Sequence, residues 1–200
     1  MEALHSTGYK RRVNGISCLA ENMPGSGAYR PGDVFKTYSG KTVEVFSTDA
    51  EGRNVLSDGL WKAGEFDPEY IVDLATLTGA VIVALGNQIS GMWSNDDNVA
   101  SKLKNAAERS GEEVWRMPLN DQFRKYMTDS AFADIRNGSI GGRAGSSNTA
   151  AAFLEFFVPN RGFEKDGEKI PWVHLDIAGS AWGPGSKASS EGVNPLFQYG

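Results

Sequence analysis

The chain has 200 residues, 40% of them hydrophobic and 22% charged, which is typical of a soluble globular domain with a real core. Its net charge of −5 disfavours a nucleic-acid partner, and the single cysteine, Cys18, excludes an intrachain disulfide. No apolar run reaches the ~18 residues of a membrane span and no signal peptide is recognisable, so we expect a cytoplasmic protein with no membrane partner.

The first third of the chain contains two predicted strands separated by a turn-rich loop. Residues 1–14 are polar and poorly specified, whereas the apolar residues of Val13–Leu19 predict a strand, weakened by Gly15. Residues 21–34 are dense in Pro and Gly, which indicates an ordered loop with fixed turns. The β-branched and aromatic residues of Thr42–Ser47 predict the second strand.

The stretch STDAEGRNVLSD carries Asp49, Glu51 and Arg53 at alternating positions, which a strand would place on one face. Apolar residues then recur at helical spacing from Val55 to Ala63, so the charged triplet is expected at a strand-to-helix turn. Two carboxylates at this spacing are able to bind one hard divalent ion or to bridge two. The alternative is a solvated turn with a fortuitous salt bridge.

The middle of the chain alternates apolar runs with helical patterns. Tyr70–Ala75 reads as a buried strand, in which we expect Asp73 to have a hydrogen-bond partner rather than a catalytic role. Val81–Leu85 is predicted as a further strand. We expect a helix from a cap at Asn95 or Asp96 to about Ser110, with Gly111 as its stop, and a short helix over Asp121–Met127.

The last third opens with a long Gly- and Ser-rich loop, Ser130–Asn148, for which functional lining and structural packing both stay open. A helix over Thr149–Val158, capped by Ser147 or Asn148, precedes a polar hairpin or loop at Gly162–Lys169. The strand Trp172–Ala178 holds His174, interpreted as a satisfied core residue rather than a metal ligand. Together these elements predict an α/β fold with a mixed sheet flanked by helices.

Four segments carry a resemblance to the leucyl aminopeptidase family, the M17 metallopeptidases. STDAEGRN resembles the family signature N-T-D-A-E-G-R-L, with Ser47 in place of Asn and Asn54 in place of Leu. The other segments are ENMP with AYRPGDV, DLATLTGA, and DIAGSAW. The resemblance implies that 15–185 is part of a peptidase catalytic domain, preceded by a poorly specified segment, 1–14, and followed by a divergent tail, 186–200.

The resemblance implies a metal-dependent aminopeptidase that releases N-terminal residues, preferably leucine-like, from peptides. Asp49 and Glu51 would bind two divalent ions, Mn²⁺ or Zn²⁺, and Arg53 would act in catalysis, holding bicarbonate or stabilising developing charge. The substrate would lie against Thr76, Leu77, Gly79, Ala178 and Ala181. Relatives in the family are hexamers, so a homo-oligomer is expected.

The family's remaining ligands, a Lys and two Asp residues, and its catalytic Lys have no counterpart in residues 1–14. We therefore expect weak metal binding and no measurable hydrolysis by these 200 residues alone. One alternative is an inactive fragment that retains the fold and a subunit-binding surface. A second is a metal-binding α/β domain of another class.

Overall fold

A computed structural model describes residues 2–139, 142, 144–183 and 187–188, and it confirms a mixed sheet flanked by helices. The main sheet has the order β3-β7-β4-β5, in which β7 pairs parallel with β3 and antiparallel with β4, and β4 pairs parallel with β5. Its strands are β3 (Ile71–Ala75), β4 (Ile89–Ser94), β5 (Glu113–Arg116) and β7 (Trp172–Asp176).

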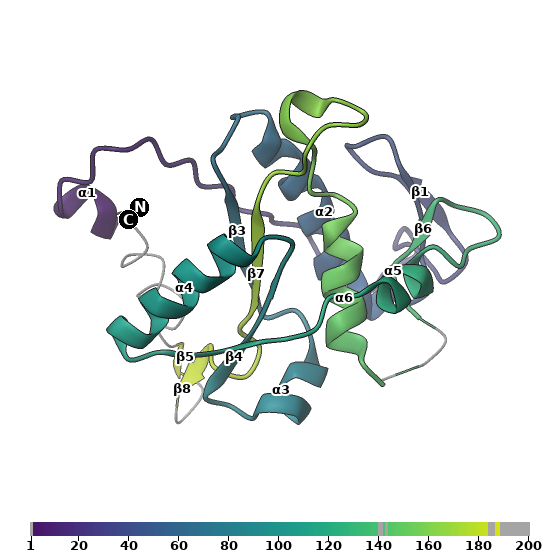
Figure 1. The fold of residues 1–200 in the computed structure, drawn as a ribbon. Helices are drawn as coiled ribbons and strands as arrows, with labels where there is room; N and C mark the ends of the chain where they lie inside the picture. Colours follow the sequence, from purple (N-terminus) through teal and green to yellow (C-terminus); the bar gives the residue numbers. More distant parts are fainter. Residues whose placement is uncertain (1, 140–141, 143, 184–186, 189–200) are drawn as a thin grey trace.

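Alternation along β7 assigns its side chains to the two faces of this sheet. Val173 and Leu175 pack with the apolar stripe of α4 (Asp97–Ser110), which covers one face. Trp172 packs on the other face with residues of α2 (Glu51–Gly64) and α6 (Ser146–Glu155). Figure 1 shows the sheet between α4 on one side and α2 with α6 on the other. The core is thus two apolar layers that share β7.

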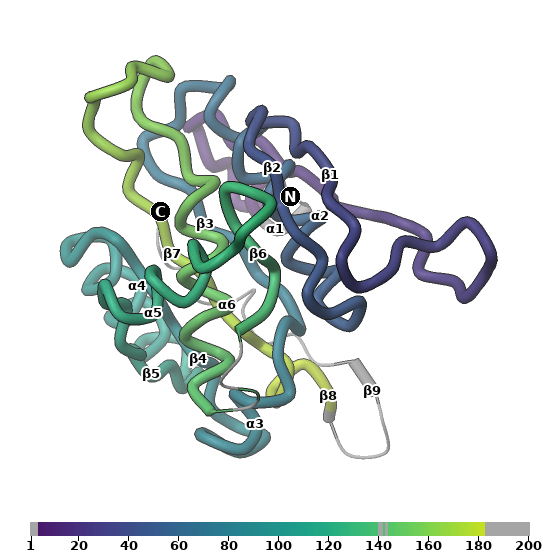
Figure 2. Tube along the Cα trace, turned by 90° about the vertical axis from the view of Figure 1, so that its right-hand side faces the viewer, coloured from purple at the N-terminus to yellow at the C-terminus, as the bar shows by residue number. Residues whose placement is uncertain are grey.

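A small three-stranded sheet lies beyond α2 and α6, away from the main sheet (Figures 1 and 2). It contains β1 (Val34–Lys36), antiparallel to β2 (Thr42–Glu44), which pairs parallel with β6 (Ile135–Arg136). A third sheet has two short strands, β8 (Trp182–Gly183) and β9 (Lys187–Ala188).

The remaining helices are short. They are α1 (Glu2–Ser6), α3 (Gly79–Leu85), α5 (Asp121–Met127), and the 3₁₀ turns η1 (Thr48–Ala50) and η2 (Arg161–Phe163). The predictions for α4 and α5 are confirmed: Asp96 caps α4 by accepting from the Val99 amide, and Gly111 ends it in the left-handed conformation. None of the described helices combines the length and apolarity needed to cross a bilayer.

The predicted strand Val13–Leu19 is wrong. Within the described residues no backbone hydrogen bond joins this segment to a neighbouring strand, and its apolar side chains stay largely exposed, Leu19 at 86%. Its apolar residues recur every third position and not every second, so no single strand face becomes apolar. Without a partner strand, no inter-strand hydrogen bonds offset the conformational entropy that the segment would lose by becoming a strand.

The predicted strand Val81–Leu85 is also wrong, because this stretch forms α3. The Thr78 hydroxyl accepts from the Val81 amide at 3.2 Å and caps the helix. A short apolar run fits a strand or a helix equally well, and the cap decides between them here.

Other boundaries also differ from the prediction. β1, β4, β5 and β6 are strands that the pattern did not indicate, and β6 lies inside the predicted loop Ser130–Asn148. Helix α6 begins at Ser146 after a left-handed Gly145, so neither Ser147 nor Asn148 is its cap. In the predicted tail 186–200, the structure describes 187–188 alone.

Candidate active site

The charged triplet lies at a strand-to-helix turn, as predicted, but not on one face of a strand. β2 ends at Glu44, Asp49 is in the 3₁₀ turn η1, and Glu51 opens α2. Residues two apart in a helix do not share a face, so the predicted common strand face for Asp49, Glu51 and Arg53 is wrong. What groups them is the tight turn from η1 into α2.

Asp49 and Glu51 carry the two carboxylates of this turn. Asp49 is exposed and Glu51 is half-buried, and within the described chain neither carboxylate takes part in a hydrogen bond or salt bridge. Both are close enough to Arg53 to act on its charge. Two such carboxylates are available for a ligand.

Arg53 is the buried cation of this turn, 9% exposed. Its Nη1 donates to the Asn137 carbonyl at 2.8 Å, while its Nε has no partner among the described groups. Burial lowers the pKa of the guanidinium to about 10, and the negative charges of Asp176, Glu51 and Asp49 oppose this shift. Arg53 therefore remains protonated at neutral pH, with carboxylates around it.

Asn137 explains why β2 is shorter than the predicted strand Thr42–Ser47. Its side-chain Oδ1 accepts from the amides of Phe46 and Ser47 at 2.8 and 3.0 Å. These two amides are thus satisfied by a side chain and not by a sheet ladder. The chain is released from the sheet and turns into η1.

A second loop, Thr76–Gly79, is held at the carboxyl end of β3 by Asp176 from the neighbouring β7. Asp176 Oδ1 accepts from the amides of Leu77 and Thr78 at 3.0 and 3.3 Å, and Oδ2 accepts from the Thr78 hydroxyl at 2.6 Å. Asp176 is 1% exposed, so this buried carboxylate is committed to holding the loop.

Two contacts bring other loops to the turn that carries Asp49, Glu51 and Arg53, called the charged turn below. A Cβ added to Gly52 would lie 3.4 Å from the Leu77 side chain, so α2 begins against the Thr76–Gly79 loop. The Tyr29 hydroxyl donates to the Thr48 carbonyl at 3.2 Å, and burial, with the nearby charge of Glu51, raises the pKa of Tyr29. Segments quoted from three of the four motifs therefore meet here.

The structure places the predicted substrate-lining residues around these loops. Thr76 and Gly79 are exposed, and an added Cβ at Gly79 would meet no described atom within 4 Å. The Ala178 amide donates to Asp176 Oδ1 at 3.2 Å and the Ala181 amide to the Ile177 carbonyl at 2.9 Å. Ala178 is thereby tied to the same carboxylate as the Thr76–Gly79 loop.

Asp73 and His174 form a separate buried cluster with Trp172. Asp73 accepts from Trp172 Nε1 and contacts His174 Nδ1, each at 2.6 Å, and His174 is fully buried. The expectation that Asp73 has a partner is confirmed, as is the core placement of His174. Sequence reasoning did not assign roles to Asp176, Asn137 or Tyr29. Asp176 and Tyr29 lie in quoted motifs, and Asn137 ends the segment ADIRN in the loop Ser130–Asn148, for which functional lining and structural packing both stayed open.

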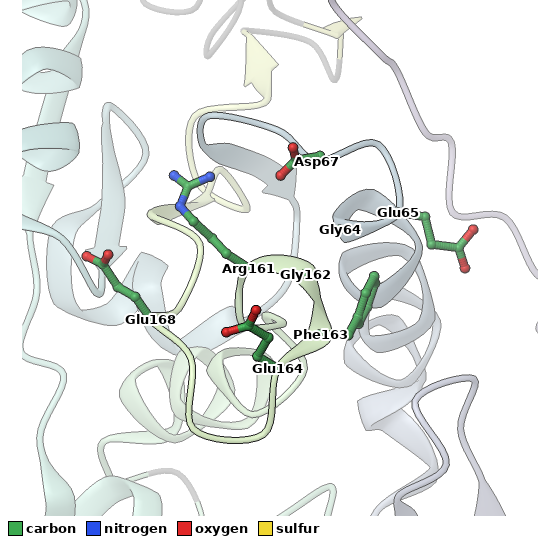
Figure 3. A pocket seen from close by; sticks show the side chains of 8 residues that line it. All are labelled: Gly64, Glu65, Asp67, Arg161, Gly162, Phe163, Glu164 and Glu168. Carbon is green, nitrogen blue, oxygen red and sulfur yellow. The ribbon is translucent and has the colours of Figure 1, made fainter.

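An acidic depression elsewhere on the surface has no feature of a site. Its volume is about 380 Å³ and it lies between the end of α2 and η2 (Figure 3). Arg161 in its wall is engaged with the carbonyls of Pro68 and Glu69, and Glu65 points away from the other carboxylates. The described residues contain no group of three or more His, Cys, Asp or Glu side chains arranged to hold a metal, here or at the charged turn.

Comparison with known proteins agrees with the motifs. The family described as "Cytosol aminopeptidase family, catalytic domain" matches residues 1–196. A cytosol aminopeptidase of Vibrio cholerae is 48% identical over 201 residues, which is 100% of this chain and 38% of that protein. A probable cytosol aminopeptidase of Cenarchaeum symbiosum is 49% identical over 183 residues, 91% of this chain and 35% of that protein.

The fold agrees as well. The structure of a tomato leucine aminopeptidase mutant superposes with a TM-score of 0.81 at 41% identity, covering 90% of this chain and 34% of that one. The chain thus spans somewhat more than a third of the length of these relatives.

Proposed function

The chain belongs to the cytosol aminopeptidase family and corresponds to part of its catalytic domain, and from this premise we propose that it contributes to metal-dependent removal of N-terminal residues from peptides. In this proposal Asp49 and Glu51 are metal ligands and Arg53 is the catalytic cation. Leucine-like apolar residues are the preferred substrates, as the name of the tomato relative suggests.

The observation that carries the proposal is the pair of unengaged carboxylates beside a buried guanidinium. A buried Arg53 with an unpartnered Nε is costly unless a ligand or its charge compensates it. Neither carboxylate, of Asp49 or of Glu51, accepts a hydrogen bond from a described residue. Water can hydrate the exposed Asp49 and the half-buried Glu51, so the buried Arg53 beside them is the feature that distinguishes this turn from an ordinary surface turn.

The donor set fits a hard divalent ion in part. Carboxylate oxygens bind both Mn²⁺ and Zn²⁺. A hard divalent ion takes about six ligands, including water. The described residues supply Asp49 and Glu51, so further ligands must come from elsewhere. When bound, the metal would act as a Lewis acid that activates water for attack on the peptide carbonyl.

The residues of the chain then have distinct tasks. Arg53, protonated at neutral pH, would stabilise the negative charge that develops on the scissile carbonyl, or hold a bicarbonate ion that assists there. The exposed Thr76 and Gly79 and the half-buried Leu77, with Ala178 and Ala181, would receive the first residue of the substrate. Family membership also supports a hexameric assembly and a cytoplasmic location.

A chimera tests this function. In the chimera, this chain replaces the 201 aligned residues of the Vibrio cholerae relative. The rest of the relative then supplies the partner segments. We expect the chimera to hydrolyse leucine p-nitroanilide with Mn²⁺, and Glu51→Ala to lower kcat at least ~100-fold, because a displaced catalytic ion costs that much. The chain alone should show no measurable hydrolysis, since two carboxylates do not fix an ion.

The matched control is Glu113→Ala, which removes an exposed glutamate on β5 and should leave the rate unchanged. A folded chimera without activity would refute the proposal, as would a chimera whose activity survives Glu51→Ala. Activity in the chain alone, abolished by Glu51→Ala, would show that the described ligands suffice.

A further inference from the structure

Asn137 forms five hydrogen bonds that converge on the charged turn, and it is fully buried. Its backbone amide donates to the Glu44 carbonyl at 3.0 Å, at the last residue of β2. Its side-chain Oδ1 accepts from the amides of Phe46 and Ser47, and its Nδ2 donates to the Ser47 carbonyl at 2.9 Å. Its own carbonyl accepts from Arg53 Nη1 at 2.8 Å.

These bonds reach both sides of the turn. Phe46 and Ser47 lead into η1, which carries Asp49, whereas Arg53 follows Glu51 by two residues in α2. A single residue therefore holds the backbone before the two carboxylates and the cation after them. Asn137 is thus bonded both to the chain that leads into the Asp49 turn and to Arg53.

The neighbours of Asn137 do not provide this link. The Arg136 guanidinium lies 5.3 Å from the Phe46 ring centroid, and a Cβ on Gly138 would lie 2.8 Å from the same ring. Both contacts fix the Phe46 side chain. Ser47 itself makes no side-chain cap bond, and its backbone amide and carbonyl are both bonded to the Asn137 side chain.

From these contacts we propose that Asn137 is a positioning residue of the active site, which sets the distance between the Arg53 guanidinium and the two carboxylates. This inference rests on the proposed function for its catalytic meaning. Its geometric content, that Asn137 orders Arg53, is separate and is measured without metal or substrate.

The test uses the full chain and two readouts. The first is solvent exchange of the Arg53 guanidinium protons by NMR, with the signal assigned by its loss in Arg53→Lys. The second is Mn²⁺ affinity by titration calorimetry. Asn137→Ala keeps the backbone carbonyl that accepts from Arg53 but loses the three side-chain bonds that hold this carbonyl in place. We therefore expect at least ~10-fold faster exchange and ~10-fold weaker Mn²⁺ binding.

Asn95→Ala is the matched control. Asn95 is also a bridging amide, which donates to the Ile170 carbonyl and accepts from the Trp172 amide, at the other end of β7 from Asp176. It should lower stability without changing Arg53 exchange or Mn²⁺ affinity. Asn137→Ser serves if the alanine variant does not fold, because a neutral hydroxyl keeps a polar group at this buried position without adding a charge; we expect ~3-fold changes in both readouts.

The outcomes separate the two proposals. Unchanged Arg53 exchange in the Asn137 variants, or an equal change in Asn95→Ala, overturns the positioning role. If Glu51→Ala leaves the activity of the chimera intact while Asn137→Ala still accelerates Arg53 exchange in the chain, the positioning role stands and the metal assignment of Asp49 and Glu51 fails.

Discussion

Two regions of this molecule hold buried charge, and they handle it in opposite ways. In the core, the Asp73 carboxylate is shared between Trp172 Nε1 and His174 Nδ1. At the charged turn, Arg53 has an orphaned Nε, and the carboxylates of Asp49 and Glu51 bond to no described residue. The Asp73 carboxylate is thus used by the fold, whereas the carboxylates of Asp49 and Glu51 remain open to water or a ligand beside a buried cation.

The largest expected effect comes from breaking the core cluster at Asp73, the carboxylate that has two buried partners. Asp73→Ala removes the acceptor for two buried donors and should lower the free energy of unfolding by about 3–5 kcal/mol, measured by urea denaturation. Asp49→Ala, at the exposed turn, should stay within about 0.5 kcal/mol. Equal losses of unfolding free energy in Asp73→Ala and Asp49→Ala would show that the two regions do not differ in this way.

A smaller effect concerns pH. Burial opposes the charging of His174, but the charge and hydrogen bond of Asp73 outweigh it and raise the pKa of His174 above 6.5. A raised pKa in the folded state contributes stability that is complete below pH 6.5 and is lost as the pH rises through the folded value. The free energy of unfolding should therefore decline above pH 6.5 by an amount that disappears in His174→Gln.

The other histidine offers the control for this pH dependence. His5 is exposed, so His5→Gln should leave the decline unchanged. An identical pH profile for wild type and His174→Gln would show that the imidazole holds no additional proton in the folded chain.

The smallest effect is expected at Ser47. Its side chain makes no cap hydrogen bond, so Ser47→Ala should change the free energy of unfolding by less than about 0.5 kcal/mol. Thr78→Val is the informative contrast, because the Thr78 hydroxyl caps α3 and donates to Asp176; it should cost about 1–2 kcal/mol. A loss at Ser47 as large as that at Thr78 would mean that the turn depends on this hydroxyl.

Sequence patterns predicted the parts of the fold whose causes are local. Helix α4 follows from an apolar stripe between Asp96 and Gly111, and β3 and β7 follow from continuous apolar runs. The pattern failed where a distant residue decided the outcome. Val13–Leu19 lacks a partner strand in the described chain, and β2 stops at Glu44 because Asn137, about ninety residues away, bonds Phe46 and Ser47.

The same division holds for the candidate site. The candidate residues could be named from the sequence, since Asp49, Glu51 and Arg53 stand in one short motif whose residue types suit a cation and a polar substrate. Only the tertiary structure decided how they are arranged, in a 3₁₀ turn and a helix and not along a strand. Hydrogen bonds from Asn137 and Asp176 join segments about 80 to 100 residues apart, and no local preference encodes such pairings.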